Sequence, residues 1–144
     1  IKGVDSTQRM TKADLAAGAK LIIRERLLTH GDQHAESGFV VNLNGEDSSA
    51  NVISRSVAKN NSTQVFNAEI NGNAKCAGHS ECDAIIMDHA KISAIPKIVA
   101  NDIDAALIHE AAIGKIAGEQ LIKLMTLGLT EQEAEAQIVN GFLK

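Results

Sequence analysis

Aromatic side chains are almost missing from this chain of 144 residues, which has three phenylalanines and neither tryptophan nor tyrosine. Its core must therefore be filled by Ile, Val, Leu and Ala, which suits thin, regularly stacked layers. The chain also lacks a basic stripe and carries a net charge of −4. With so few rings to stack on bases, it is not expected to bind nucleic acid.

Long apolar runs are lacking as well. The longest, residues 21–23 and 84–87, are far too short to span a bilayer, so we expect no membrane association. The N-terminus shows neither a secretory pattern nor an initiator Met, which suggests a processed chain or a piece of a longer one. Without a secretory pattern, the two cysteines predict reduced thiols in a cytoplasmic protein rather than a disulfide framework.

What the chain does have, over residues 18–113, is short strands separated by turns rich in Asn and Gly. Phe39, Val41 and Leu43 alternate with their neighbours, and Phe66 and Ile70 lie in a second stretch of the same kind. This period of two, bounded by turns at 44–47 and 71–73, is typical of β-strands. Asn-Gly between two strands also fits an antiparallel hairpin, which stays open as the local alternative.

The spacing of the apolar strand centres favours a different arrangement. These centres fall near Leu21, Leu43, Val65 and Ile86, a step of about 21 residues that fits one coil of a parallel β-solenoid. Small and β-branched interiors, with Asn, Ser and Gly at the corners, suit coils that bury their inward side chains against the next coil.

Two amphipathic helices are predicted near the C-terminus, at 119–127 and 131–143. Gly128 stands where a left-handed C-cap is expected, and Thr130 with Glu133 makes a capping box. The short connection predicts an antiparallel helical hairpin. The expected organisation is therefore a β-helix core over residues 1–116, as part of a longer core, and a helical element over 117–144.

Within the second predicted helix, Ala134, Ile138 and Phe142 share one face, and Leu129 with Ala134 makes a hydrophobic staple. Residues 105–116 just before the hairpin are ambiguous. Their composition favours helix, but their apolar residues also alternate with a period of two.

Cys76, His79 and Cys82 form a C-x2-H-x2-C pattern, with His89 seven residues further on. Thiolate and imidazole are suitable ligands for zinc or an iron–sulfur cluster. In a continuous strand, however, the two cysteines share one face and His79 points to the other. Cys82 then packs as a small buried residue, and both interpretations remain open at this point.

His109-Glu110 is the second candidate pair. Adjacent strand residues point to opposite faces, so the two are not expected to act together on one substrate atom. A hydrolase with either residue as general base would need a partner from a neighbouring coil. No nucleophile elbow or phosphate-binding loop accompanies them.

The runs SECDAIIMD, AIPKI and IHEAAIGKIAGEQLIKLMTLGLTEQEAEAQIVNGFLK, in that order, resemble the C-terminal part of the SufB/SufD family. These proteins are scaffold components of the Suf machinery for iron–sulfur cluster assembly. The resemblance implies a right-handed parallel β-helix followed by a small helical domain, and it implies strand rather than helix for the ambiguous segment.

The resemblance also implies partners. Family members pair as SufB-like and SufD-like subunits through their β-helices, as homodimers or heterodimers. Their C-terminal helices dock SufC, an ABC-type ATPase. On this likeness the docking element comprises Glu119, Leu121, Leu124, Met125, Glu131, Ile138 and Phe142. The alternative is that these helices only cap the open end of the solenoid, and both roles are compatible.

The family's cluster ligands carry over only in part. Ala90 stands at the position of the family's ligand Cys, and Ser93 at that of the accompanying His. Glu110 matches the family Glu, whereas Cys82 matches a buried core Cys. If a cluster forms, the remaining donors are Glu110, His109, His89 and Cys76. The resemblance thus implies a non-enzymatic scaffold, and the alternative is a structural or regulatory partner of the ATPase that binds no cluster.

Overall fold

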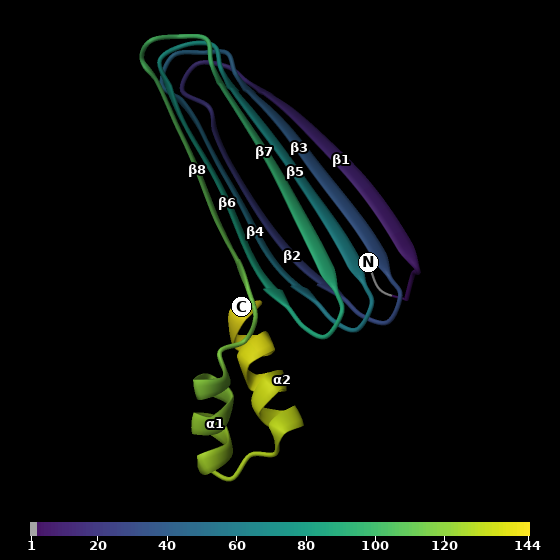
Figure 1. Cartoon of the computed structure of the whole chain (residues 1–144). Helices are drawn as coiled ribbons and strands as arrows, with labels where there is room; N and C mark the ends of the chain where they lie inside the picture. Colours follow the sequence, from purple (N-terminus) through teal and green to yellow (C-terminus); the bar gives the residue numbers. More distant parts are fainter. Residues whose placement is uncertain (1–2) are drawn as a thin grey trace.

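The computed structural model describes residues 3–144, which form eight strands followed by two helices (Figure 1). The strands are β1 Ser6–Leu15, β2 Lys20–Thr29, β3 His34–Leu43, β4 Ser48–Ala58, β5 Thr63–Gly72, β6 Cys76–Ile86, β7 Lys91–Ala100 and β8 Ala105–Gly114, and the helices are α1 Gly118–Thr126 and α2 Glu131–Phe142. Within residues 3–144, no helix is both long and apolar enough to cross a membrane.

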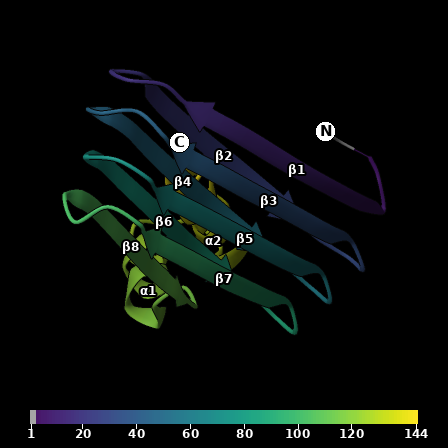
Figure 2. The same cartoon turned by 90° about the horizontal axis from the view of Figure 1, so that it is seen from above.

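The strands build two four-stranded sheets, with the orders β1-β3-β5-β7 and β2-β4-β6-β8. The chain changes sheet at every corner, so each successive pair of strands is one coil of a β-solenoid of about four coils, stacked as Figure 2 shows. All strand pairings among the described residues are parallel, which excludes an antiparallel hairpin at Asn44-Gly45. The predicted parallel β-solenoid is confirmed.

The coil is longer than the sequence suggested. His34 pairs with Thr63, and Ser48 pairs with Cys76, so one coil takes 28 or 29 residues. The expected step of about 21 residues is wrong. The four apolar centres used to derive it belong to two different sheets, because those at 21 and 86 lie in β2 and β6 whereas those at 43 and 65 lie in β3 and β5.

One row of corners is held by residues in the left-handed backbone region. Gly31, Asn60 and Asp88 have φ angles of 60°, 61° and 58° and lie above one another in successive coils. The Asn60 amide donates to Asp88 Oδ2 at 2.9 Å, and the Gly31 amide donates to Asn60 Oδ1 at 2.9 Å. Asn and Asp tolerate this conformation because their short side chains bond to nearby backbone.

At the opposite corners an amide ladder repeats with the coil. Asn73 Nδ2 donates to Asn44 Oδ1, and Asn101 Nδ2 donates to Asn73 Oδ1, both at 2.7 Å. Each carboxamide offers both a donor and an acceptor, so one side chain can bond to the coil before it and to the coil after it. The Asn-rich turns seen in the sequence are thus the stacked corners of the solenoid.

The core lies between the two sheets and follows the predicted alternation. Phe39, Val41 and Leu43 are 2%, 1% and 0% exposed, and Phe66 and Ile70 in the next coil are also buried. The rings of Phe39 and Phe66 pack against each other across the two coils, tilted by 49° and with centroids 5.8 Å apart. Aliphatic and small side chains fill the rest, as the shortage of aromatics predicted.

The ambiguous segment is strand β8, as the family resemblance implied. It pairs with β6 along its whole length, and Leu107 packs against the core. The neighbouring strand satisfies the backbone of this segment and the core takes up its side chains, so tertiary context overrides helix propensity here.

The helical hairpin follows the predicted capping signals. Gly128 has a φ of 95°, and the Thr130–Glu133 capping box is present. Ala134 is buried, but Val139 rather than Ile138 joins the apolar cluster, in which Phe142 also packs. Val57 and Met87 of the solenoid belong to the same cluster, so the second helix is anchored to the strand ends.

The capping box gives a pH-dependent contribution to the stability of α2. The Thr130 backbone amide and hydroxyl donate to the Glu133 carboxylate and lower its pKa. A carboxyl with a lowered folded-state pKa stabilises the fold above its ordinary pKa of 4.5, and loses that effect as the pH falls through the folded value.

We expect Thr130→Ala to destabilise α2 by about 1 kcal/mol at neutral pH. Amide hydrogen exchange in α2 measures this, and Gln132→Ala at an exposed helical site should leave the rates unchanged.

Candidate functional site

The C-x2-H-x2-C pattern lies in one continuous strand, and its ligands do not converge. Cys76 and Cys82 in β6 point inward and are 6% and 1% exposed, whereas His79 lies on the outer face of the same strand. Alternate strand residues share a face, so two residues six apart share a face but lie about 20 Å apart, and the one midway points to the opposite face. The chain therefore does not close a three-ligand site from this pattern.

The other predicted cluster donors are equally dispersed. His89 is exposed in the corner at 87–90, and Glu110 is exposed on the outer face of β8. His109 is the register partner of the buried Ser80 and so faces the interior. Glu110, His109, His89 and Cys76 thus lie at four separate places, and His109 and Glu110 lie on opposite faces of their strand, as expected.

Inside the last two coils, two buried polar atoms on neighbouring strands are left without partners. His109 Nδ1 and Ser80 Oγ are buried, and neither finds a hydrogen-bond partner among residues 3–144. They sit side by side on β8 and β6, away from the outer face that carries Glu110. Unsatisfied groups of this kind are uncommon and costly.

Three donor side chains do meet on the outer face of the β2-β4-β6-β8 sheet. His79 and Glu81 come from β6, and Glu110 is the register partner of Glu81 on β8. Their ligand atoms all lie within 4.8 Å of one another, and His79 Nε2 is 3.5 Å from Glu110 Oε2. On the other side of the ring, His79 Nδ1 lies 3.1 Å from Asn51 Oδ1 of β4.

Glu81 and Asn51 escaped the sequence analysis, although a signal for them exists. His79 and Glu81 are separated by one residue in a strand, so they share a face. The step of 29 residues then brings Glu110 beside Glu81, and the step of 28 brings Asn51 beside His79. With the wrong coil length these neighbours could not be recognised.

The outer-face cluster is acidic. Burial raises the pKa of Glu81 above its usual value, and the adjacent Asp83 carboxyl raises it further, against the opposing effects of His79 and Arg55. Imidazole nitrogen and carboxylate oxygen are donors that suit divalent cations of intermediate softness. The arrangement can therefore hold a cation or, when His79 is protonated, an ion pair.

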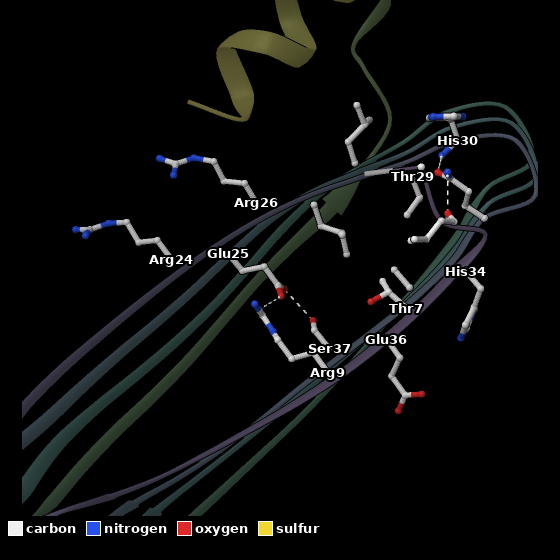
Figure 3. A pocket seen from close by; sticks show the side chains of 16 residues that line it. Thr7, Arg9, Arg24, Glu25, Arg26, Thr29, His30, His34, Glu36 and Ser37 are labelled. Atoms are coloured by element: carbon white, nitrogen blue, oxygen red, sulfur yellow. Dashed lines mark hydrogen bonds and ion pairs between the residues drawn. The ribbon is translucent and has the colours of Figure 1, made fainter. Parts of the chain in front are cut away.

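A larger cavity, of about 670 Å³, opens between the sheets at the first coil (Figure 3). Glu25 points into it, with Arg9 Nη2 2.6 Å from Glu25 Oε1. The hydroxyls of Ser37 and Ser54 donate to Glu25 Oε2 at 2.8 Å and 3.0 Å. Both carboxylate oxygens are thus satisfied by the protein, although the Arg9 side chain is 53% exposed. This fits a structural ion pair at the mouth of the cavity better than a free binding group.

The buried thiols are expected to be chemically inert in the folded protein. Burial raises the pKa of Cys82 to about 11, and that of Cys76 is raised for the same reason. At pH 8, about one-thousandth of the Cys82 thiol is therefore ionised, and only thiolate reacts readily.

We expect a disulfide reagent to label neither cysteine at pH 8 until denaturant is added. Ile103→Cys, at a site 99% exposed, is the positive control, and rapid labelling of Cys82 would contradict the prediction.

Comparison with known proteins gives a consistent result. Residues 4–142 match the family described as SUF system FeS cluster assembly, SufBD core domain. An iron-sulfur cluster assembly SufBD family protein of Methanothermobacter thermautotrophicus is 35% identical over 127 residues, which cover 87% of this chain and 31% of the relative.

Two further relatives carry the same family name. The one from Methanocaldococcus jannaschii is 41% identical over 105 residues, or 72% of this chain and 33% of the relative. The one from Pyrococcus horikoshii is 38% identical over 120 residues, or 82% of this chain and 27% of the relative. The chain thus spans about a third of the length of these curated relatives.

Proposed function

Because the chain belongs to the SufBD family of iron–sulfur cluster assembly proteins, we propose that it is a non-enzymatic scaffold component of a cytoplasmic cluster assembly complex. In this proposal it pairs with a second SufB/SufD-like subunit through the β-solenoid and docks a SufC-like ABC-type ATPase through its C-terminal helices. The observation that carries the docking proposal is the uncovered apolar surface of α1.

That surface consists of Ile122 and Met125 on α1 and of Leu127 at its C-cap, which are 63%, 43% and 76% exposed. Apolar side chains gathered along one short helix and its end, and not used to attach it to the solenoid, are typical of a docking surface. Ile122 and Leu127 were not among the expected docking residues. Of those expected, Glu119 and Glu131 are exposed and Leu121, Leu124 and Ile138 are half-buried. Phe142 packs toward the sheet and serves for attachment.

The last coil supports pairing with a second subunit. Strands β7 and β8 each pair with a neighbouring strand on one side, which leaves a backbone edge at which strands can be added. Ile95, Ile103 and Ile108 in and beside these strands are 55%, 99% and 56% exposed. An open edge flanked by apolar side chains favours a homodimer or heterodimer.

The lack of exposed thiol ligands supports the alternative, a structural or regulatory subunit that binds no cluster itself. Ala90 occupies the position where the family resemblance calls for a ligand Cys, and it is buried in the corner at 87–90. Both thiols of the chain are also buried, and thiolate is the usual cluster ligand. Any cluster assembled here would therefore draw thiolates from a partner chain.

Copurification with the ATPase tests the docking proposal. We expect the paired substitutions Ile122→Asp and Leu127→Asp to reduce ATPase recovery by at least about tenfold, because each charge enters an apolar contact. Deletion of residues 118–144 should have the same effect. Met10→Asp, at an exposed apolar site on β1, is the matched control and should retain the ATPase. Full recovery with the paired variant would refute docking through α1.

Anaerobic reconstitution with iron and sulfide separates the two functions. A scaffold that holds a cluster gains visible charge-transfer absorption, alone or together with its partner subunit. A colourless product from both preparations, with the fold intact, would eliminate the scaffold function and leave the structural subunit.

A further inference from the structure

The His79 imidazole is held in one tautomer by its neighbour. His79 Nδ1 lies 3.1 Å from Asn51 Oδ1, and a carboxamide oxygen can only accept a hydrogen bond. Nδ1 therefore carries the hydrogen, and in the neutral ring Nε2 presents its lone pair outward. This is the way in which a carbonyl or carboxylate partner prepares a histidine for metal binding.

In the neutral ring, that lone pair faces another electron donor. His79 Nε2 is 3.5 Å from Glu110 Oε2, and Glu81 brings a second carboxylate to the same point. An imidazole lone pair and two carboxylates repel one another unless a positive charge lies between them. A bound cation supplies that charge, and protonation of His79 is the competing way to supply it.

The donor spacing suits a single metal ion. Bonds of about 2.0–2.2 Å to nitrogen and oxygen place neighbouring donors about 3–3.5 Å apart. The three donor atoms already lie within 4.8 Å of one another. The Glu110 side chain is 66% exposed and free to rotate, so small rotations close the remaining gap without backbone movement.

The surroundings favour a cation and leave room beside it. Glu81, Asp83 and Glu110 contribute three carboxylates to this part of the face, against one nearby guanidinium, that of Arg55. A shallow groove of about 350 Å³ adjoins the cluster and is lined by Asn51, His79, Lys20 and apolar side chains that include Ile22 and Ile108. The cluster therefore borders a recess rather than a flat surface.

We propose that His79, Glu81 and Glu110 bind one divalent transition-metal ion, such as Fe²⁺, on the outer face of the solenoid, and that Asn51 is a positioning residue for His79. The donor set contains no thiolate, and water completes the coordination. The site would hold a single ion rather than a thiolate-ligated cluster. That this ion is iron destined for a cluster rests on the proposed function, whereas the binding itself does not.

Titration of the metal-free protein with Fe²⁺ under anaerobic conditions tests the site, with Co²⁺ absorption as a parallel readout of coordination. We expect one equivalent to bind. His79→Ala, Glu81→Gln and Glu110→Gln should each weaken binding by at least about tenfold, and Asn51→Ala by about 10–100-fold. Circular dichroism and thermal melting confirm that the variants remain folded.

Two controls make the result specific. Glu69→Gln removes a carboxylate from the outer face of the other sheet, where it pairs with Lys97, and should leave the affinity unchanged. Cys82→Ser should also bind normally, because its thiol lies inside the solenoid. Loss of binding in Cys82→Ser, or unchanged binding in His79→Ala, would overturn the proposal.

The metal titration also separates a metal site from a simple ion pair. If neither Fe²⁺ nor Co²⁺ binds to the folded protein, His79 and Glu110 form only an ion pair. Metal binding without ATPase copurification would reject the docking role alone, and the reverse result would reject the metal site alone.

Discussion

Gly45→Ala is expected to destabilise the protein by about 3 kcal/mol or more, at or above the upper end of overpacking effects. A Cβ at position 45 would lie 2.0 Å from the backbone nitrogen of Ala17 and 2.5 Å from the carbonyl carbon of Ala16. These are backbone atoms of the corner in the preceding coil, so no rotamer change can relieve the clash. The two stacked corners must separate, which disrupts the hydrogen bonds between them, such as that from the Gly18 amide to the Glu46 carbonyl.

Gly38→Ala in the same coil is the matched control. Its Cβ would lie 2.4 Å from Met10 Cε, but this atom ends a flexible side chain that is 64% exposed. Met10 can swing away, so we expect a cost of less than about 1 kcal/mol. Equilibrium urea unfolding measures both variants, and equal stabilities would show that the corners do not pack as closely as described.

Leu43→Ala is expected to cost about 3–5 kcal/mol, near the upper end of the range for buried leucines. Leu43 is 0% exposed and stacks on Leu15, its register partner in the preceding coil. Leu43 also packs closely on Gly78 of the opposite sheet. A Cβ added at Gly78 would lie only 3.3 Å from Leu43 Cδ1. The two sheets are held at their spacing by coils on both sides, so the cavity left by truncation cannot collapse fully.

Thermal melting gives the readout, since each kcal/mol lowers the melting temperature of a domain of this size by about 2–4 °C. Ile103→Ala removes a side chain that is 99% exposed and should change the melting temperature little. A drop of less than about 3 °C for Leu43→Ala would indicate that the core relaxes around the missing side chain.

The fold was predictable where local chemistry and long-range arrangement agree. Alternation at Phe39, Val41 and Leu43 specified which faces are inward, and the Thr130–Glu133 capping box located the start of the second helix within one residue. For residues 105–114, by contrast, intrinsic propensity pointed to helix. The period-two alternation left strand open, and the resemblance to SufB/SufD proteins decided for it, because pairing with β6 is a tertiary effect that local composition does not carry.

The coil length was missed for a physical reason, and the site was missed with it. Hydrophobic centres mark strands without telling which of two similar sheets each belongs to. The corner residues are better markers, because Asn44, Asn73 and Asn101 recur at the true step. Once that step is known, the sequence predicts that Glu81 and Glu110 are neighbours on one face. The candidate metal ligands are then the His and Glu side chains of the outer surface rather than the thiols.

The corners also determine where the chain can change in length. The corner at 73–75 is one residue shorter than the corner at 44–47 on which it stacks, yet β6 keeps its inward residues inward. A single deletion at a corner is thus absorbed locally. The same deletion in the middle of a strand would exchange core and surface side chains up to the next corner. Insertions and deletions should therefore be tolerated at the ends of the coils and rejected along their sides, whatever the residues involved.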